Sequence, residues 1–173
     1  LRAAFPEADA LLPETPFVQF RVTGYPVRLI AIDTLSENSN QGDFCAVRAD
    51  NLRAVLADGA DMPTAIFMHH PPFDIHESKY PFQFETRESV ARMSGALDGH
   101  GHVVRAFCGH SHRDVSGVIG GVPISSMPSV AVDKRLGDFP DTMRSSPVYR
   151  IHRYDADSGF ISETRPCPEM IAG

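Results

Sequence analysis

Two apolar runs of the chain end abruptly at histidine, and they dominate its pattern of hydrophobic and polar positions. Residues 64–68 read TAIFM and continue into HHPP, whereas residues 103–108 read VVRAFC and continue into GHSH. A short apolar run that is bounded by turn residues is typical of a buried strand. We therefore expect a strand at each of these two places, with histidines at the point where the strand ends.

Helical periodicity marks the two segments that precede these strands. Residues 45–61 and 87–99 each place apolar side chains three or four positions apart, which predicts one amphipathic helix in each segment. Thr86 is a candidate N-cap for the second helix. The apolar positions are Val47, Leu52, Val55 and Leu56 in the first segment and Val90, Met93 and Leu97 in the second.

Three pairs of β-rich runs predict hairpins near the two ends of the chain. The pairs lie in 17–32, 116–132 and 147–166, and each is interrupted by glycine with other turn-forming residues. Residues 1–16 are expected to be a short helical or irregular lead-in. Residues 36–44 are expected to be a polar loop, and the aromatic-rich residues 73–86 an ordered loop.

Strand–helix–strand units flanked by hairpins predict an α/β fold with a mixed sheet, flanking helices and terminal hairpins. The chain has 173 residues, of which 42% are hydrophobic, and this is enough for one compact domain over residues 1–173. A second sheet that faces the first is consistent with the pattern.

Charge and cysteine content narrow the classes of function. The formal net charge is -6 and no basic run stands out, so we expect binding neither to nucleic acid nor to an anionic membrane. No apolar stretch approaches the length of about 20 residues that crosses a bilayer. The three cysteines form no CxxC pair, which favours free thiols in a reducing compartment, and we expect a cytoplasmic protein.

The histidines at the two strand ends are the strongest candidates for chemistry. Neutral imidazole binds Zn, Mn and Fe, and strand ends in α/β sheets carry many ligand sites. Taken singly, HxH is often a polar surface turn and HH before PP is often ordinary strand-end sequence. Together, the two similar contexts favour a metal site that includes His69, His110 and His112.

The other candidate residues favour structural roles. No GxSxG or phosphate-binding loop is present, and Ser111 lacks a recognisable oxyanion turn. A buried core residue is the better interpretation of Cys108 than a catalytic thiol. The remaining histidines favour helix-stop, surface, loop or hairpin positions; they are His76, His100, His102 and His152.

The motifs FMHHPPF and FCGHSH, about forty residues apart, resemble the second half of a calcineurin-like metallophosphoesterase. The nearest branch contains bacterial cyclic-nucleotide and glycerophosphodiester phosphodiesterases, and the resemblance covers roughly residues 17–130. It implies the C-terminal half of an αββα sandwich. It also implies hydrolysis of small-molecule phosphodiesters or phosphomonoesters by two divalent ions, which would be Mn, Fe or Zn.

The resemblance also implies roles for individual residues. His69 and His110 would bind one ion and His112 the other, while His70 would support the site without binding metal. Bound ions would supply positive charge for a phosphate despite the acidic composition.

The chain departs from the family in one large respect. The family has DxH, GDxxD and GNH[DE] blocks before HHPP, and none of them occurs there in this chain; the GDF at residues 42–44 follows the wrong strand. We therefore expect a C-terminal fragment that lacks the N-terminal metal-binding half. Such a fragment would hold one ion or none, would be inactive, and would pair with another copy through an exposed sheet.

Two other interpretations remain open. The chain could be a non-catalytic metallophosphoesterase-like module that binds a partner or a single Zn²⁺ ion. Ligand number alone would also allow a mononuclear zinc hydrolase that uses the three predicted ligands, with Asp74 or Asp114 as the general base.

Overall fold

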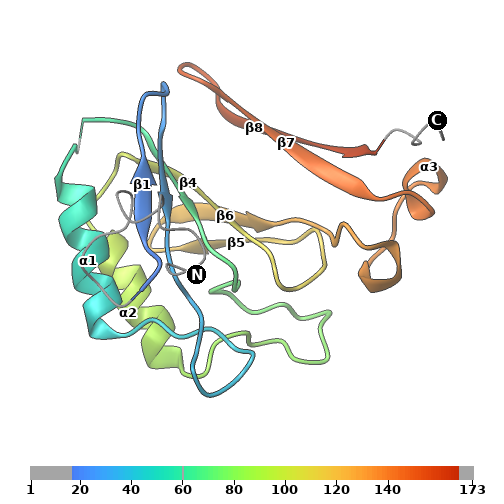
Figure 1. Cartoon of the computed structure of the whole chain (residues 1–173), viewed down its shortest axis with the longest axis horizontal. Helices are drawn as coiled ribbons and strands as arrows, with labels where there is room; N and C mark the ends of the chain where they lie inside the picture. Colours follow the sequence, from blue (N-terminus) through green and yellow to red (C-terminus); the bar gives the residue numbers. More distant parts are fainter. Residues whose placement is uncertain (1–16, 60, 168–173) are drawn as a thin grey trace.

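A six-stranded mixed sheet forms the centre of the protein in this computed structural model, which describes residues 17–59 and 61–167 (Figure 1). The strand order is β1-β2-β3-β4-β6-β5; the four inner strands are parallel and the two outer strands antiparallel to their neighbours. The strands are β1 (Phe20–Val22), β2 (Arg28–Ala31), β3 (Thr64–Phe67), β4 (Val103–Cys108), β5 (Ser116–Ile119) and β6 (Val122–Ser126).

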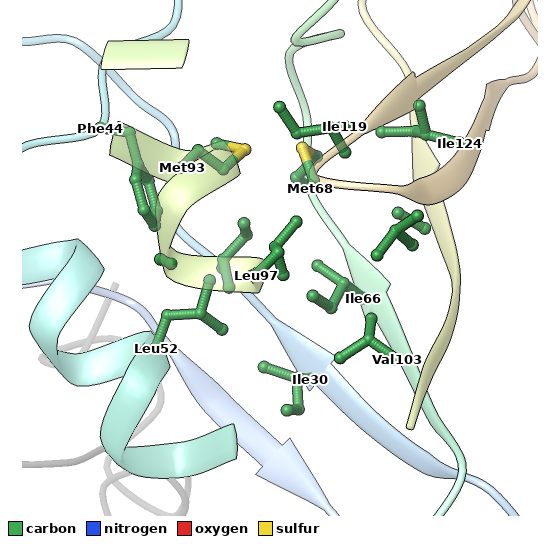
Figure 2. Close-up of a cluster of buried hydrophobic side chains, with 14 of the residues drawn as sticks. Ile30, Phe44, Leu52, Ile66, Met68, Met93, Leu97, Val103, Ile119 and Ile124 are labelled. Atoms are coloured by element: carbon green, nitrogen blue, oxygen red, sulfur yellow. The ribbon is translucent and has the colours of Figure 1, made fainter. Parts of the chain in front are cut away.

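The two long helices cover one face of this sheet (Figure 1). Helices α1 (Ala46–Ala57) and α2 (Arg87–Leu97) connect β2 to β3 and β3 to β4. Their buried side chains and those of the central strands form the main core, which contains Leu52, Met93 and Ile66 (Figure 2). The predicted cap is present, because the Ser89 N–H donates to Thr86 Oγ1 at 3.1 Å.

The buried face of α1 differs from the face that periodicity predicts. Val47 was expected to face the core, but it is 53% exposed, whereas Arg48 and Ala49 are buried. Arg48 is held inside by polar groups of the preceding loop: its guanidinium donates to the carboxylate of Asp43 and to the carbonyl oxygen of Leu35. A buried charge that is paired and hydrogen-bonded can replace an apolar side chain at a core-facing position, and sequence periodicity does not detect this.

The C-terminal hairpin forms a separate two-stranded sheet on the opposite face (Figure 1). It consists of β7 (Val148–Asp155) and β8 (Gly159–Pro166). Aromatic contacts attach it to the large sheet: the Phe107 ring lies 5.3 Å from Phe160 and 3.9 Å from the imidazole of His152. A 3₁₀ turn (Val132–Lys134) and the short helix α3 (Asp141–Arg144) precede the hairpin, and the sequence pattern predicted neither.

The α/β class, the mixed sheet, both long helices and the three hairpins are confirmed. The assignment to half of a sandwich stays a prediction, and the predicted lead-in at 1–16 lies outside the described residues. Cys45, Cys108 and Cys167 are free thiols. None of the helices in the described part of the chain has the length and apolarity that a bilayer crossing requires.

A buried arginine closes the C-terminal end of α1. The Arg28 side chain is almost fully buried, and it donates to the carbonyl oxygens of Val55 and Asp58 and to Thr64 Oγ1. The last carbonyls of a helix have no partner within the helix and carry partial negative charge. Arg28 therefore satisfies these groups and joins α1 to the start of β3.

Replacement of Arg28 by methionine should lower the free energy of unfolding by about 2–4 kcal/mol, because buried carbonyl oxygens lose their donors. Urea denaturation followed by circular dichroism measures this change. Arg53→Met on the same helix is the matched control, since the Arg53 side chain is 45% exposed and forms an ion pair with Asp50 on the surface of the helix. Equal stability of the two variants would contradict the capping role of Arg28.

Candidate metal centre

The carboxyl ends of the four parallel strands lie at one edge of the sheet, and the candidate site is built there. Beyond the paired residues Phe67 and Phe107, the ladder between β3 and β4 continues into the histidine motifs. The Met68 N–H donates to the Phe107 carbonyl oxygen at 3.0 Å, and the Gly109 N–H donates to that of His69 at 2.9 Å. This pairing places the HHPP segment directly beside the GHSH turn.

His69 and His110 meet across this pair of strand ends. The Nε2 atom of His69 lies 3.1 Å from the Nδ1 atom of His110, and the two ring centroids are 5.0 Å apart. His69 is exposed and His110 is half-buried, so a cation can approach both nitrogens from solvent. The two residues are forty-one positions apart in sequence, and the parallel register alone brings them together.

His70 joins this cluster from the buried side. Ligand atoms of His69, His70 and His110 all lie within 4.8 Å of one another, and among the described residues this is the one set of three or more metal-binding side chains. The Nε2 atom of His70 lies 3.2 Å from the carbonyl oxygen of Asn40, and its Nδ1 atom lies 2.9 Å from Thr34 Oγ1. A carbonyl oxygen only accepts, so Nε2 carries the hydrogen and Nδ1 accepts from the hydroxyl group.

Both ring nitrogens of His70 are therefore engaged with the protein. A histidine in this state orients its neighbours and does not offer a free lone pair, which agrees with the supporting role inferred from the sequence. Gly42 makes the arrangement possible, because a Cβ atom there would lie 2.9 Å from the Cβ atom of His70 and 3.0 Å from the Phe84 ring.

His112 lies outside this compact cluster. Its side chain is exposed, and its carbonyl oxygen accepts from the Leu136 N–H at 3.0 Å. His112 is near enough to influence the charge of His69 and His110. Of the three predicted ligands, the structure thus brings His69 and His110 into contact and leaves His112 exposed outside the cluster. The third member of the compact cluster is His70.

The GHSH turn has a strained backbone. His110 and His112 have φ values of 62° and 58°, a left-handed conformation that is unfavourable for residues other than glycine. Such conformations persist where surrounding contacts fix them, and they are frequent at functional sites.

Three hydroxyl and amide groups hold this turn. The Arg113 N–H donates to Ser111 Oγ at 3.3 Å, the two hydroxyl groups of Ser111 and Ser126 lie 2.8 Å apart, and Ser126 Oγ donates to the Arg113 carbonyl oxygen. Since Ser126 uses its hydrogen for that carbonyl, Ser111 donates to Ser126. The turn is thereby tied to the end of β6.

The cluster is uncharged near neutral pH. Burial lowers the pKa of His70 to about 4, and the neighbouring His110 and His69 add to the shift. Partial burial among the rings, with a contribution from His112, also lowers the pKa of His69. Burial lowers the pKa of His110, and His69 and His112 lower it further. Neutral His69 and His110 rings each keep a lone pair, which metal binding requires.

The other predicted candidates lie elsewhere or have other partners. His102 lies 3.4 Å from the guanidinium of Arg28, at the opposite end of β4. Burial raises the pKa of the Cys108 thiol to about 12, which fits its predicted place in the core. The two aspartates proposed as bases are ion-paired: Asp74 with Arg87 and Asp114 with Arg150.

Sequence reasoning missed the residues that hold the histidines. Thr34 follows β2 and Ser126 ends β6, so both occupy the same sheet edge as the histidines. A polar residue at the end of an apolar run is a signal that could have identified them, although such residues are common. The contact of His70 with the carbonyl oxygen of Asn40 has no sequence signal, because any residue supplies a carbonyl group.

A cavity of about 380 Å³ adjoins the same turn. Arg113 and Asp114, which directly follow His112, line it together with Glu77 from the 73–86 loop and Phe139 from the segment before α3. The predicted ordered loop therefore contributes to a cavity wall beside the histidine motif.

Comparison with known proteins identifies phosphodiesterases as relatives. The chain is 30% identical over 97 residues to glycerophosphodiester phosphodiesterase GpdQ of Enterobacter lignolyticus, covering 56% of this chain and 34% of that protein. It is 23% identical over 168 residues to a probable glycerophosphodiester phosphodiesterase of Arcobacter nitrofigilis, covering 95% and 61%. A probable cyclic nucleotide phosphodiesterase of Rhodopseudomonas palustris is 30% identical over 113 residues, covering 62% and 39%.

These relatives confirm the resemblance to metallophosphoesterases. No family model matches the chain. The matched region spans between 34% and 61% of the length of these curated relatives.

In the metal-free chain, the free energy of unfolding should fall progressively as the pH falls from about 6.5 to about 4, because protonation of His70 is unfavourable in the folded state. The folded state holds the pKa of His70 at about 4, below the ordinary value of 6.5, so the folded state favours the neutral ring. The stability that this neutral ring contributes is complete above pH 6.5 and decreases toward pH 4, by up to about 3 kcal/mol.

Proton–carbon NMR of the histidine rings, in the presence of a chelator, measures this property. The His70 signal should stay constant between pH 8 and pH 5.5, whereas all histidine signals should titrate near about 6.5 when the chain is unfolded in urea. A His70 signal that titrates above pH 6 in the folded chain would refute the buried, neutral assignment.

Proposed function

We propose that this chain supplies the histidine side of a metal-dependent phosphodiesterase site, in which His69 and His110 bind one divalent ion and His112 contributes to a second. The observation that carries the proposal is the 3.1 Å separation of His69 Nε2 and His110 Nδ1 at the carboxyl ends of two adjacent parallel strands. The relatives, which are named as phosphodiesterases, support the reaction class.

The separation of the two nitrogens suits a shared ion. With a metal–nitrogen distance of about 2.1 Å, two imidazoles on one ion lie about 3.0 Å apart at a right angle and about 3.4 Å apart at the tetrahedral angle. The observed distance falls between these values. This distance is compatible with one shared ion of Zn, Mn or Fe, which would replace the direct hydrogen bond between the two rings.

Each of the chain's own residues has a defined task in this proposal. His69 and His110 present neutral nitrogens to the cation, and His70 keeps the neighbouring rings in place through its bonds to Thr34 and Asn40. A bound divalent ion would polarise a phosphoryl oxygen and activate a water molecule. The substrate class is a small-molecule phosphodiester or phosphomonoester, and the adjoining cavity is the proposed place of its alcohol portion.

The cluster contains no carboxylate among the described residues. Two ions about 3.5–4 Å apart need a bridging group to offset their mutual repulsion. We therefore propose that this chain alone holds one ion and that the complete two-ion site needs carboxylates from further sequence. Free thiols favour a cytoplasmic setting, and the edge strands β1 and β5 of the large sheet would allow association with a second copy.

The same absence of carboxylates favours a second candidate function, a non-catalytic module that binds a single Zn²⁺ ion. The proposed phosphodiesterase site requires a nucleophile and two ions, whereas a binding module requires only affinity for one ion. Metal stoichiometry and turnover, measured together, separate these two candidates.

Isothermal titration calorimetry with Zn²⁺ should give about one ion per chain, and His69→Ala and His110→Ala should each weaken binding by about tenfold or more, because each removes a ligand. His100→Ala is the matched control, since His100 lies near the opposite end of β4, where its ring packs against His102. Equal affinity of the control and the two ligand variants would refute the proposed ligands.

The purified chain with Mn²⁺ should hydrolyse bis(p-nitrophenyl) phosphate no faster than Mn²⁺ in buffer, because the second ion lacks holders. Release of p-nitrophenolate measures the rate. Turnover that His69→Ala and His110→Ala abolish would contradict the need for further carboxylates while supporting the histidine site.

A further inference from the structure

The C-terminal hairpin reaches the histidine motif through one buried side chain. Arg150 lies on β7, and only 7% of its side chain is exposed. Each of its three nitrogens has a different partner: Nε donates to Thr164 Oγ1 at 2.9 Å, Nη1 to the Ser126 carbonyl oxygen at 3.0 Å, and Nη2 to the Asp114 carboxylate. Arg150 thus joins β8, the end of β6 and the segment after GHSH.

Two of these partners, Ser126 and Asp114, lie next to or within the strained turn and help to hold it. Ser126 accepts from Ser111 through its hydroxyl group and donates to the Arg113 carbonyl oxygen through the same group. Its N–H also donates to the Val115 carbonyl oxygen at 2.8 Å. A side chain that fixes Ser126 and Asp114 together therefore fixes both ends of the segment that follows His110 and contains His112.

The bonds of Arg150 matter because the backbone of the GHSH turn is strained. The left-handed backbone of His110 and His112 is unfavourable in isolation, so the surroundings must impose it. Arg150 is suited to this task, because a guanidinium group donates in a rigid planar fork and the Arg150 side chain is itself buried, while its partner Asp114 is 50% exposed.

We infer that Arg150 is a positioning residue of the proposed metal site. Through its bonds to Ser126 and Asp114 it holds the 111–115 segment in place, so that the imidazoles of His110 and His112 keep their orientations. This inference rests on the proposed metal-binding function. It also assigns Asp114 a partner and a structural task, in place of the role of a general base.

The hairpin does not depend on Arg150 alone for its attachment. Phe107 contacts both Phe160 and His152 from the hairpin, and Val148 is fully buried. Removal of the guanidinium should therefore leave the fold intact and loosen mainly the turn.

The test compares four variants of the whole chain. Arg150→Met removes all three bonds, Arg150→Lys keeps the charge without the fork, and Asp114→Asn removes the carboxylate. Arg153→Met is the matched control on the same strand, because the Arg153 side chain is 62% exposed and its partner Glu163 belongs to the hairpin. Two readouts are taken: Co²⁺ affinity with the visible spectrum of bound Co²⁺, and amide hydrogen exchange of Arg113 and Ser126 in the metal-free chain.

The inference predicts that Arg150→Met weakens Co²⁺ binding by about 10–100-fold, as losses of groups that orient metal ligands do. The spectrum should change in shape, since the ligand directions change. Arg150→Lys should recover only part of the affinity, Asp114→Asn should show a smaller loss, and Arg153→Met should match the unmodified chain. The two amides should exchange about tenfold faster in Arg150→Met, because local opening of the turn becomes easier.

Folded Arg150→Met and Asp114→Asn chains with unchanged affinity, spectrum and exchange would overturn the inference. If Arg150→Met fails to fold, the Asp114→Asn variant tests the inference instead: unchanged affinity, spectrum and exchange in that variant would overturn it. An unmodified chain that binds no Co²⁺ overturns the metal proposal instead. In that case, amide exchange of Arg113 and Ser126 in Arg150→Met still tests the positioning role of Arg150. Unchanged exchange overturns this role, and faster exchange supports it.

Discussion

The parallel pairing of β3 with β4, extended by the bond from the Gly109 N–H to the His69 carbonyl oxygen, is the constraint on which the site depends. It aligns two motifs that are distant in sequence and brings two imidazole nitrogens to 3.1 Å. A shift of the register by one residue would turn each side chain to the opposite face of the sheet. The packing of both helices against the central strands supports this register, so the main core also fixes the geometry of the histidine cluster (Figure 2).

Polar contacts next to the histidines fix the ring orientations and the turn that strand pairing alone leaves free. Thr34 and the Asn40 carbonyl oxygen fix the ring of His70, while Ser126 and Arg150 fix the turn that follows His110. Each contact satisfies a group that would otherwise be buried without a partner, which is unfavourable by about 1–3 kcal/mol. The stability of the sheet edge and the precision of the histidine cluster therefore have the same physical origin.

The sequence predicted the strands, helices and hairpins well, because apolar runs, periodicity and glycine turns are local signals. It also predicted that His69 and His110, whose strand-then-histidine contexts are alike, lie close together; their role as metal ligands stays a prediction. It could not locate Arg48 in the core or Arg150 behind the turn, since both depend on partners that only the folded chain brings near. The exposed position of His112 likewise follows from the backbone of the turn, which the spacing of two histidines does not determine.

The four inner strands each contribute one polar tip to the same edge: Thr34, the His69–His70 pair, His110 and Ser126. No short stretch of the polypeptide contains more than a part of this arrangement. A synthetic peptide that carries HHPP or GHSH would therefore lack the geometry of the cluster, because the spacing of its imidazoles would no longer be set by the alignment of four strands. The arrangement of the histidine rings thus reports the completed sheet, and partially folded forms would lack it.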